Sequence, residues 1–148
     1  MREGTPIIRP MREDDLDTVM TIEKQVFQDP WSRRSYMFEI YSNRYSLPLV
    51  LVLNGEIIGH AVVWLLFEEY HIATIAIAPQ HQGKGWGRFF LNALLSMADG
   101  ADFAILEVRR GNRKAIRLYE KMGFYMNGIR RQYYQDGEDA LVMRKDFT

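Results

Sequence analysis

The sequence predicts a single α/β domain of the α+β kind, spanning residues 1–148 and built on a mostly antiparallel sheet. Three observations predict this class. The pair Asn54-Gly55 between two apolar runs is typical of a tight hairpin joining antiparallel strands. The stretch 72–78 contains one polar residue, Thr74, and a strand that is apolar on both faces is typical of the middle of a covered sheet. Apolar residues at helical spacing recur between the strand segments.

Seven strands and four helices are expected in order along the chain. The strands are 5–9, 46–53, 56–67, 70–78, 103–108, 125–134 and 140–145, the last two joined around Asp136-Gly137. Asp14, Ser32 and Asn112 are each expected to open a helix, because their side chains accept hydrogen bonds from the first turn. The pair Asp29-Pro30 should stop the first helix, and Gly123 should end the last one in a left-handed cap.

The remaining helix follows a glycine-rich turn after Pro79. Its apolar positions recur three and four residues apart, which predicts one stripe that faces the sheet. These positions are Trp86, Phe89, Phe90, Ala93, Leu94 and Met97.

Composition excludes several classes of function. The chain has no cysteine, which excludes disulfides, thiolate metal sites and a cysteine-bound acyl intermediate. Its three histidines show no metal-binding spacing, so no metal is expected. The 19 Lys and Arg balance the 19 Asp and Glu, which gives no field favouring nucleic acid. No apolar run approaches the roughly 20 residues of a membrane span, and the N-terminus lacks a signal-peptide core, so a cytoplasmic enzyme is expected.

The most informative segment is the glycine-rich turn. It reads Gln82, Gly83, Lys84, Gly85, Trp86, Gly87, Arg88. Glycines that open a helix let unpaired backbone N–H groups approach a phosphate, and Lys84 and Arg88 add positive charge. A dinucleotide fingerprint fails at Arg88, and a P-loop fails because Gly85 follows Lys84 where a hydroxyl is needed. The segment resembles the Q/R-x-x-G-x-G/A element that binds the coenzyme A pyrophosphate in the GNAT superfamily of N-acetyltransferases. A glycine-rich turn without a ligand remains the alternative.

Two more regions make the resemblance specific, and together they cover most of the chain from about Ile7 to Met143. The second half of the chain resembles the superfamily in Leu106-Glu107-Val108-Arg109, Asn112, Ala115, Leu118-Tyr119 and Gly123-Phe124. Pro30-Trp31-Ser32, Tyr133-Tyr134 and Glu138-Asp139-Ala140 are similar to the branch that acetylates the N-terminal alanine of a small-subunit ribosomal protein, and to its archaeal relatives.

The resemblance implies a twisted mixed sheet whose fourth and fifth strands splay apart, with acetyl-coenzyme A in the gap as the acetyl donor. Backbone groups of Ile75, Ala76 and Ile77 would pair with the pantetheine arm, and the amides of Gly83 to Arg88 would hold the pyrophosphate. Asn112 would bond the cofactor arm, although helix capping alone also explains an asparagine there.

Glu107 is the candidate general base. A carboxylate in an apolar strand costs free energy unless it is partnered or useful, and the resemblance implies a glutamate base here. The alternative is a surface residue at a sheet end.

Tyr119 is the candidate acid, because two helical turns place it on the face of Asn112. A core aromatic is the alternative. His71 is more typical of a sheet histidine than of a catalyst. Without cysteine, direct transfer in a ternary complex is expected.

Four residues are candidates for holding the acceptor: Trp31, Glu69, Tyr133 and Tyr134. Each of the aromatics could instead serve only in packing. Arg113 and Lys114 are interpreted as a solvated basic pair.

The leading hypothesis is acetylation of a protein N-terminus by a monomer or weak dimer, the substrate being a ribosomal protein. An acetyltransferase for a small amine or a lysine side chain, and a non-catalytic acyl-coenzyme A sensor, are the alternatives.

Overall fold

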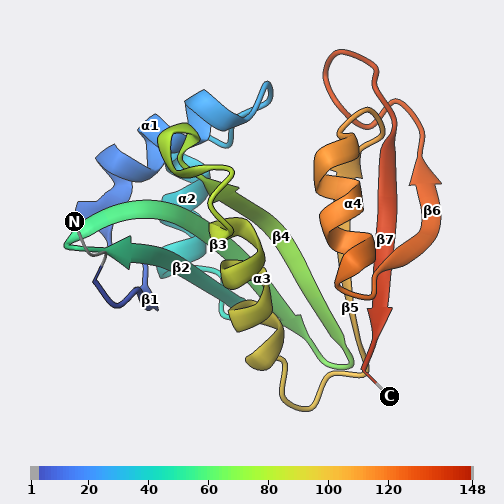
Figure 1. Cartoon of the computed structure of the whole chain (residues 1–148), viewed down its shortest axis with the longest axis horizontal. Helices are drawn as coiled ribbons and strands as arrows, with labels where there is room; N and C mark the ends of the chain where they lie inside the picture. Colours follow the sequence, from blue (N-terminus) through green and yellow to red (C-terminus); the bar gives the residue numbers. More distant parts are fainter. Residues whose placement is uncertain (1–3, 148) are drawn as a thin grey trace.

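The structure is a computed structural model that describes residues 4–147. Within this range seven strands form one sheet in the order β1-β2-β3-β4-β5-β7-β6 (Figure 1). The strands are β1 (Ile7–Pro10), β2 (Ser46–Leu53), β3 (Glu56–Leu66), β4 (Glu69–Ile77), β5 (Phe103–Arg109), β6 (Tyr125–Arg130) and β7 (Ala140–Asp146). The α-helices found in this range are α1 (Leu16–Val26), α2 (Arg33–Tyr41), α3 (Trp86–Ser96) and α4 (Arg113–Lys121).

All neighbouring strands pair antiparallel except β4 and β5, which are parallel. The predicted class, a mixed and mostly antiparallel sheet of seven strands with four helices, is therefore confirmed for the described residues. The last strand, β7, inserts between β5 and β6 rather than adding to the edge. Among residues 4–147, no helix has the length and apolar character needed to cross a membrane.

The helices cover the two faces of the sheet in pairs. Side chains of a strand alternate between faces, and along β2 Val50 packs with α1 and α2 whereas Leu49 and Leu51 join the cluster under α3 and α4. Figure 1 shows α3 and α4 in front of the strands and α2 behind them. Each face thus has its own apolar core.

Several local predictions are confirmed. The Asn54-Gly55 turn has φ of 53° and 78°, the left-handed pair that a two-residue hairpin requires. The Ser32 hydroxyl accepts a hydrogen bond from the Ser35 backbone N–H at 3.0 Å, which caps α2. Gly123, with φ of 95°, follows α4 in the left-handed conformation. Turn and cap chemistry is local, so it can be read from the sequence.

Three local predictions are wrong, and they concern the cap of α1, the buried face of α3 and the end of β6. Asp14 does not cap α1, because Glu13–Asp15 forms a 3₁₀ turn and the Asp15 carboxylate instead accepts from the Arg12 backbone N–H at 2.8 Å. In α3 the buried residues are Phe90, Leu91 and Leu94, whereas Phe89 and Met97 are about two-fifths exposed. The buried stripe is therefore rotated from the predicted one.

The strand predicted over 125–134 ends at Arg130. Gln132 takes a φ of 50°, which no strand continues through. Tyr133 and Tyr134 consequently lie in a long loop between β6 and β7, which runs over 131–139.

Candidate active site

A gap opens between β4 and β5. The two strands pair only over Glu69–His71 of β4, yet β4 continues to Ile77 and β5 to Arg109 (Figure 1). The predicted splay between the fourth and fifth strands is confirmed. Backbone groups of Ile72–Ile77 that face this side have no strand partner among the described residues. An extended chain carrying amide groups could pair with them as an added strand does.

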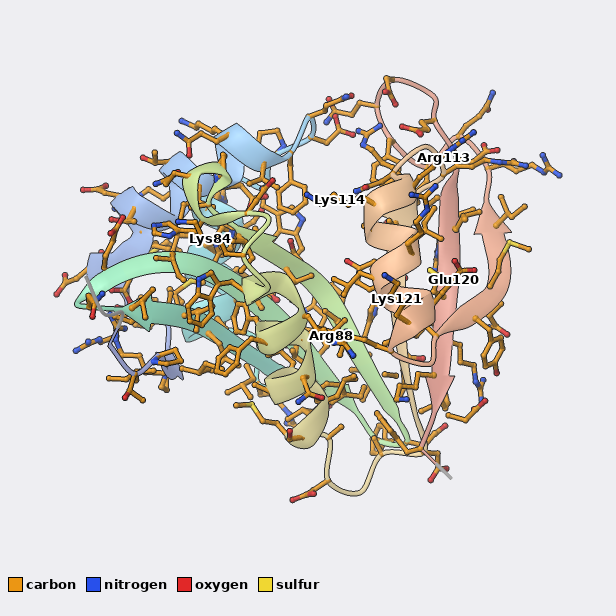
Figure 2. All side chains as sticks on the ribbon, viewed as in Figure 1. Lys84, Arg88, Arg113, Lys114, Glu120 and Lys121 are labelled. Atoms are coloured by element: carbon orange, nitrogen blue, oxygen red, sulfur yellow. The ribbon has the colours of Figure 1, made fainter. Side chains whose placement is uncertain are left out.

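The glycine-rich turn lies at one side of this gap, where α3 begins. Gly83 and Gly85 have φ of 78° and 90°, and an added Cβ on either would meet nothing within 4 Å. Glycine is needed there for its backbone conformation, not for lack of room. Lys84 and Arg88 are exposed beside the first turn of α3, as Figure 2 shows. Free N–H groups and positive charge at a helix start suit a phosphate.

Two predicted cofactor residues have a structural task in this fold. The Gln82 side chain donates from Nε2 to the Ile77 carbonyl at 2.9 Å and so ties the turn to the end of β4. Asn112 Oδ1 accepts from the Ala115 backbone N–H at 3.2 Å, which caps α4. Their contact with a cofactor stays a prediction. The Trp86 indole N–H is buried and has no partner among residues 4–147.

Glu107 is paired with a histidine. Its two carboxylate oxygens lie 3.0 and 3.1 Å from Nε2 of His71, and its side chain is 13% exposed. Because a carboxylate cannot donate, the imidazole donates from Nε2. Glu69 lies on the other side of the ring, with Oε2 at 3.7 Å from Nδ1. His71 is thus held between two carboxylates at the point where the strands separate.

Glu107 and Tyr119 lie on opposite faces of the sheet. Leu106 and Val108 belong to the core cluster under α3 and α4, which Tyr119 also contacts, so Glu107 between them faces the side of α1 and α2. Tyr119 is half-buried with its ring 5.9 Å from that of Phe124, and burial raises the pKa of its hydroxyl to about 12. The hydroxyl therefore stays protonated at neutral pH.

Trp31 forms part of an aromatic wall on the face of Glu107. Its ring stacks on Trp64 at 6.4 Å between centroids, and Trp64 meets His71 edge-on at 5.1 Å. A pocket of about 460 Å³ opens beside the two tryptophans. The wall therefore reaches from the loop between α1 and α2 to the carboxylate at the gap.

A buried carboxylate fixes this wall from behind. Glu23 is 1% exposed; its Oε2 accepts from the Trp31 backbone N–H at 2.9 Å. Its Oε1 accepts from the Tyr36 hydroxyl at 2.5 Å and lies 2.9 Å from Nε2 of His60. A buried charge is tolerated when it is hydrogen-bonded in this way.

The loop over 131–139 forms the opposite wall and is organised by Arg109. The Arg109 guanidinium bonds the carboxylates of Asp29, Asp136 and Glu138 at 2.9 to 3.2 Å. It also lies 4.0 Å above the ring of Tyr134, which meets Tyr133 edge-on. Burial is the main cause that raises the pKa of Tyr134 to about 12. Since Asp29 belongs to the loop between α1 and α2, Arg109 ties the two walls together.

The profile of the acetyltransferase (GNAT) family matches residues 16–124. The chain belongs to the GNAT acetyltransferase family. It is 36% identical over 139 residues to a putative [ribosomal protein bS18]-alanine N-acetyltransferase of Bacillus subtilis, covering 92% of both chains. The crystal structure of the ribosomal-protein-S18-alanine N-acetyltransferase from Escherichia coli superposes with a TM-score of 0.88 at 32% identity, over 97% of this chain and 95% of that one.

A more distant likeness concerns the fold alone. Arabidopsis thaliana Naa50, in complex with the bisubstrate analogue CoA-Ac-MVNAL, superposes with a TM-score of 0.82 at 21% identity, over 97% of this chain and 100% of that chain. The present chain is an N-acetyltransferase by its family and its nearer relatives.

The candidate site contains residues to which the sequence alone assigned no functional role. His71 was expected to be an ordinary sheet histidine, but it touches Glu107 from 36 positions away. Arg109 and Glu23 hold the two walls. Within the described range, no group of three or more His, Asp or Glu side chains could hold a metal ion. A carboxylate within an apolar strand, together with the family resemblance, gave a signal for Glu107, whereas nothing local marked its histidine partner.

Proposed function

We propose that this enzyme transfers the acetyl group of acetyl-coenzyme A to the α-amino group of a protein N-terminus. The proposed acceptor is the N-terminal alanine of ribosomal protein bS18, which would place the reaction in the cytoplasm. The resemblance over 92% of the chain to acetyltransferases of that substrate supports the acceptor. The proposed single catalytic unit is the whole domain, residues 1–148.

One observation carries the proposal. The Glu107–His71 pair lies where β4 and β5 separate, on the sheet face opposite to Tyr119. A donor bound along Ile75–Ile77, with its phosphates at the turn before α3, would bring its thioester into the gap between them. An acceptor amine would reach the same carbon from the side of Trp31 and Tyr134.

The protonation equilibria of the two amines favour an α-amino group over a lysine side chain as the acceptor. An α-amino group titrates at about pH 7.7–8.0 and a lysine at about 10.4. At pH 7 roughly one α-amine in ten is neutral, against roughly one lysine in 2,500. A base of ordinary strength is therefore sufficient for the α-amine. Glu107, oriented by His71, would take the proton as nitrogen attacks the thioester carbon, directly or through a water.

Tyr119 would act on the leaving sulfur from the other face. Its pKa of about 12 keeps the hydroxyl protonated. Complete transfer of its proton to a thiolate with a pKa near 8.5 would be unfavourable by about 5 kcal/mol. We therefore expect Tyr119 to donate a hydrogen bond to the sulfur as the C–S bond breaks and the N–C bond forms. Coenzyme A would leave as the thiolate and take a proton from water, and Glu107 would return the amine proton to water.

Acetylation of synthetic peptides tests the acceptor. Peptides beginning with Ala, Ser, Met and Met-Leu would be compared with an N-terminally blocked peptide that contains lysine, and mass spectrometry would locate the acetyl group. We expect the free N-terminal alanine to be modified and the lysine control to remain unmodified. Equal modification of lysine would refute the proposed acceptor while leaving acetyl transfer intact.

Initial-rate kinetics test the proposed ternary complex. Double-reciprocal lines at several acceptor concentrations should intersect, because no cysteine is available to carry the acetyl group. Parallel lines, with an acetylated enzyme detected by mass spectrometry in the absence of acceptor, would contradict direct transfer.

A further inference from the structure

The acetyl-transfer chemistry described above does not use the pocket of about 460 Å³ beside Trp31 and Trp64. This pocket opens between β3 and α2, which lies behind the sheet in Figure 1. Both indoles line it, together with Phe38, whose side chain is 55% exposed although it is apolar. Two charged residues of α2, Arg34 and Glu39, line it as well. Apolar walls with a few polar groups among them are typical of ligand sites.

Glu39 is a buried carboxylate without a cation beside it. Its residue is 5% exposed, and its oxygens accept hydrogen bonds from the Trp64 indole N–H, the Asn43 amide and the Ser46 hydroxyl. All three donors are neutral, so these bonds do not cancel the negative charge. Within residues 4–147 no Lys, Arg or His lies at ion-pair distance from this carboxylate.

The other buried acidic side chains of the described range each have a basic partner. Asp15 pairs with Arg9 at 2.8 Å, and Glu23 lies 2.9 Å from Nε2 of His60. Acidic side chains are seldom buried unless they are paired, because an uncompensated charge away from water is costly. Glu39 departs from this rule at the wall of an open pocket. A cationic group that entered the pocket would supply the missing partner.

The two indoles favour a cation too. Trp31 and Trp64 lie with their planes 19° apart, and the hydrogen bond to Glu39 fixes the second ring. Tryptophan faces attract ammonium and guanidinium groups, and a planar guanidinium also stacks on them. Arg34 is exposed and forms neither an ion pair nor a cation–ring contact with any residue in the range 4–147. Water screens its charge more strongly than that of a buried carboxylate.

The pocket continues from the proposed acceptor site. Trp31 belongs to both, and the ring of Trp64 meets that of His71, the partner of Glu107, edge-on at 5.1 Å. Because β3, β4 and β5 are neighbours in the sheet, Trp64 lies about two strand spacings, roughly 10 Å, from the strand of Glu107. An extended peptide advances by about 3.3 Å per residue. An acceptor whose amine lies at Glu107 therefore passes the pocket with its second to fourth residues.

We infer that this pocket binds a cationic side chain, arginine or lysine, carried by the second, third or fourth residue of the acceptor peptide. The charge would lie at Glu39 and the remainder of the side chain against the two indoles. The inference rests on the proposed function, acetylation of a peptide N-terminus, and names a subsite that selects among acceptors. Its consequence is discrimination between N-termini that share the same first residue.

Peptides that differ in one charge test the inference. Arginine is placed at position 2, 3 or 4 of an otherwise neutral peptide that begins with alanine. It is compared with citrulline, which has nearly the same shape without the charge, and with glutamate. For at least one position KM should be about ten-fold lower with arginine than with citrulline, the size expected from a partly desolvated cation–ring contact and one ion pair. The kcat should change by less than about two-fold, because the contact is the same in the ground state and the transition state.

Three variants locate the preference, measured as the KM for citrulline divided by the KM for arginine. Glu39→Gln keeps an oxygen that can accept from Trp64 but removes the charge, so the ratio should fall close to one. Arg34→Gln should raise the ratio about two- to three-fold, because it removes a like charge from the rim. The matched control is Arg33→Gln, the neighbouring arginine of α2, which pairs with Asp17 and does not line the pocket. It should leave the ratio unchanged.

A circular dichroism melt of each variant verifies folding. If Glu39→Gln does not fold, the comparison of the two exposed arginine variants decides the inference, because only Arg34→Gln should raise the ratio.

The possible results separate this inference from the proposed function. Equal KM for arginine and citrulline at all three positions overturns the cation pocket, whereas acetylation of the N-terminal alanine leaves the proposed function standing. A ratio that persists in Glu39→Gln, or that is unchanged in Arg34→Gln, overturns this pocket as the source of the preference. A lower KM with glutamate than with citrulline also overturns it, since Arg34 would then set the preference. If no peptide is acetylated, the proposed acceptor is wrong, and this inference is wrong with it.

Discussion

The substitution Glu107→Gln removes the charge of the proposed base while preserving its shape. In the native protein the carboxylate accepts from Nε2 of His71 at 3.0 Å. The glutamine carbonyl can accept the same hydrogen bond, so the pairing between β4 and β5 should persist. Because Glu107 faces α1 and α2, whereas Leu106 and Val108 face α3 and the proposed cofactor site, affinity for coenzyme A should not change.

The size of the effect follows from the acceptor. General bases contribute about 10²- to 10⁴-fold, and an α-amine that is already roughly one-tenth neutral at pH 7 needs the lower part of that range. We expect kcat to fall about 10²- to 10³-fold at pH 7, a barrier higher by about 3–4 kcal/mol. At pH 9 the amine is largely neutral in solution. The part of the fall in kcat that comes from having to form the neutral amine, up to about ten-fold, should therefore be absent at pH 9.

The assay is release of free coenzyme A thiol at saturating acceptor, at pH 7 and pH 9, with calorimetric binding of coenzyme A in parallel. Glu68→Gln is the matched control, since it removes one negative charge from an exposed residue next to β4. The reasoning is refuted if Glu107→Gln keeps kcat within about three-fold of the unmodified enzyme, or if coenzyme A affinity falls together with kcat. If Glu107→Gln still binds coenzyme A but loses turnover, the hypothesis that the protein is a non-catalytic acyl-coenzyme A sensor is also excluded.

Three further substitutions test other parts of the site. Tyr119→Phe should lower kcat about 10- to 100-fold with little change in the KM for the peptide, because it removes a hydrogen bond made to the departing sulfur; an unchanged kcat would exclude that role. Arg109→Ala should raise the peptide KM about ten-fold or more and leave coenzyme A binding unchanged, because both walls lose their common partner. Steady-state kinetics with varied peptide measure this. An equal loss of affinity for coenzyme A would point to a general disturbance of β5. Glu23→Gln should lower the free energy of unfolding by about 2–4 kcal/mol in urea titration. The amide cannot accept all of the hydrogen bonds that the buried carboxylate accepts, including that from Trp31. A loss below about 0.5 kcal/mol would show that the network is not needed for stability.

Tertiary contacts corrected the local predictions for physical reasons. Phe89 fits a helical apolar stripe, yet Phe90, Leu91 and Leu94 are the residues of α3 that pack on the sheet, and this leaves the Phe89 ring 40% exposed. Asp14 does not cap α1 because Glu13–Asp15 forms a 3₁₀ turn before the helix, and in this turn Asp15 is the buried residue that pairs with Arg9 of β1 at 2.8 Å. Periodicity gives the presence of a helix more reliably than its rotation, since the rotation depends on the partner surface.

Local chemistry in the sequence determined which strands and helices this protein forms, and it marked the glycine turn and Glu107 of the candidate site. Turn glycines, caps and alternation depend on residues a few positions apart, so the Asn54-Gly55 hairpin, the glycine turn at 83–87 and the single carboxylate in the apolar strand at Glu107 were all visible in the chain. The catalytic roles of Glu107 and Tyr119 themselves stay predictions.

Only the tertiary structure decided which side chains meet. His71 contacts Glu107 because β4 and β5 pair in register as far as His71 and no further, and strand register is a property of the assembled sheet. Arg109 joins Asp29, 80 positions away, to Asp136 and Glu138 of the loop over 131–139, which lie 27 and 29 positions away. Such contacts depend on packing between distant segments, for which no local pattern of residues carries a signal.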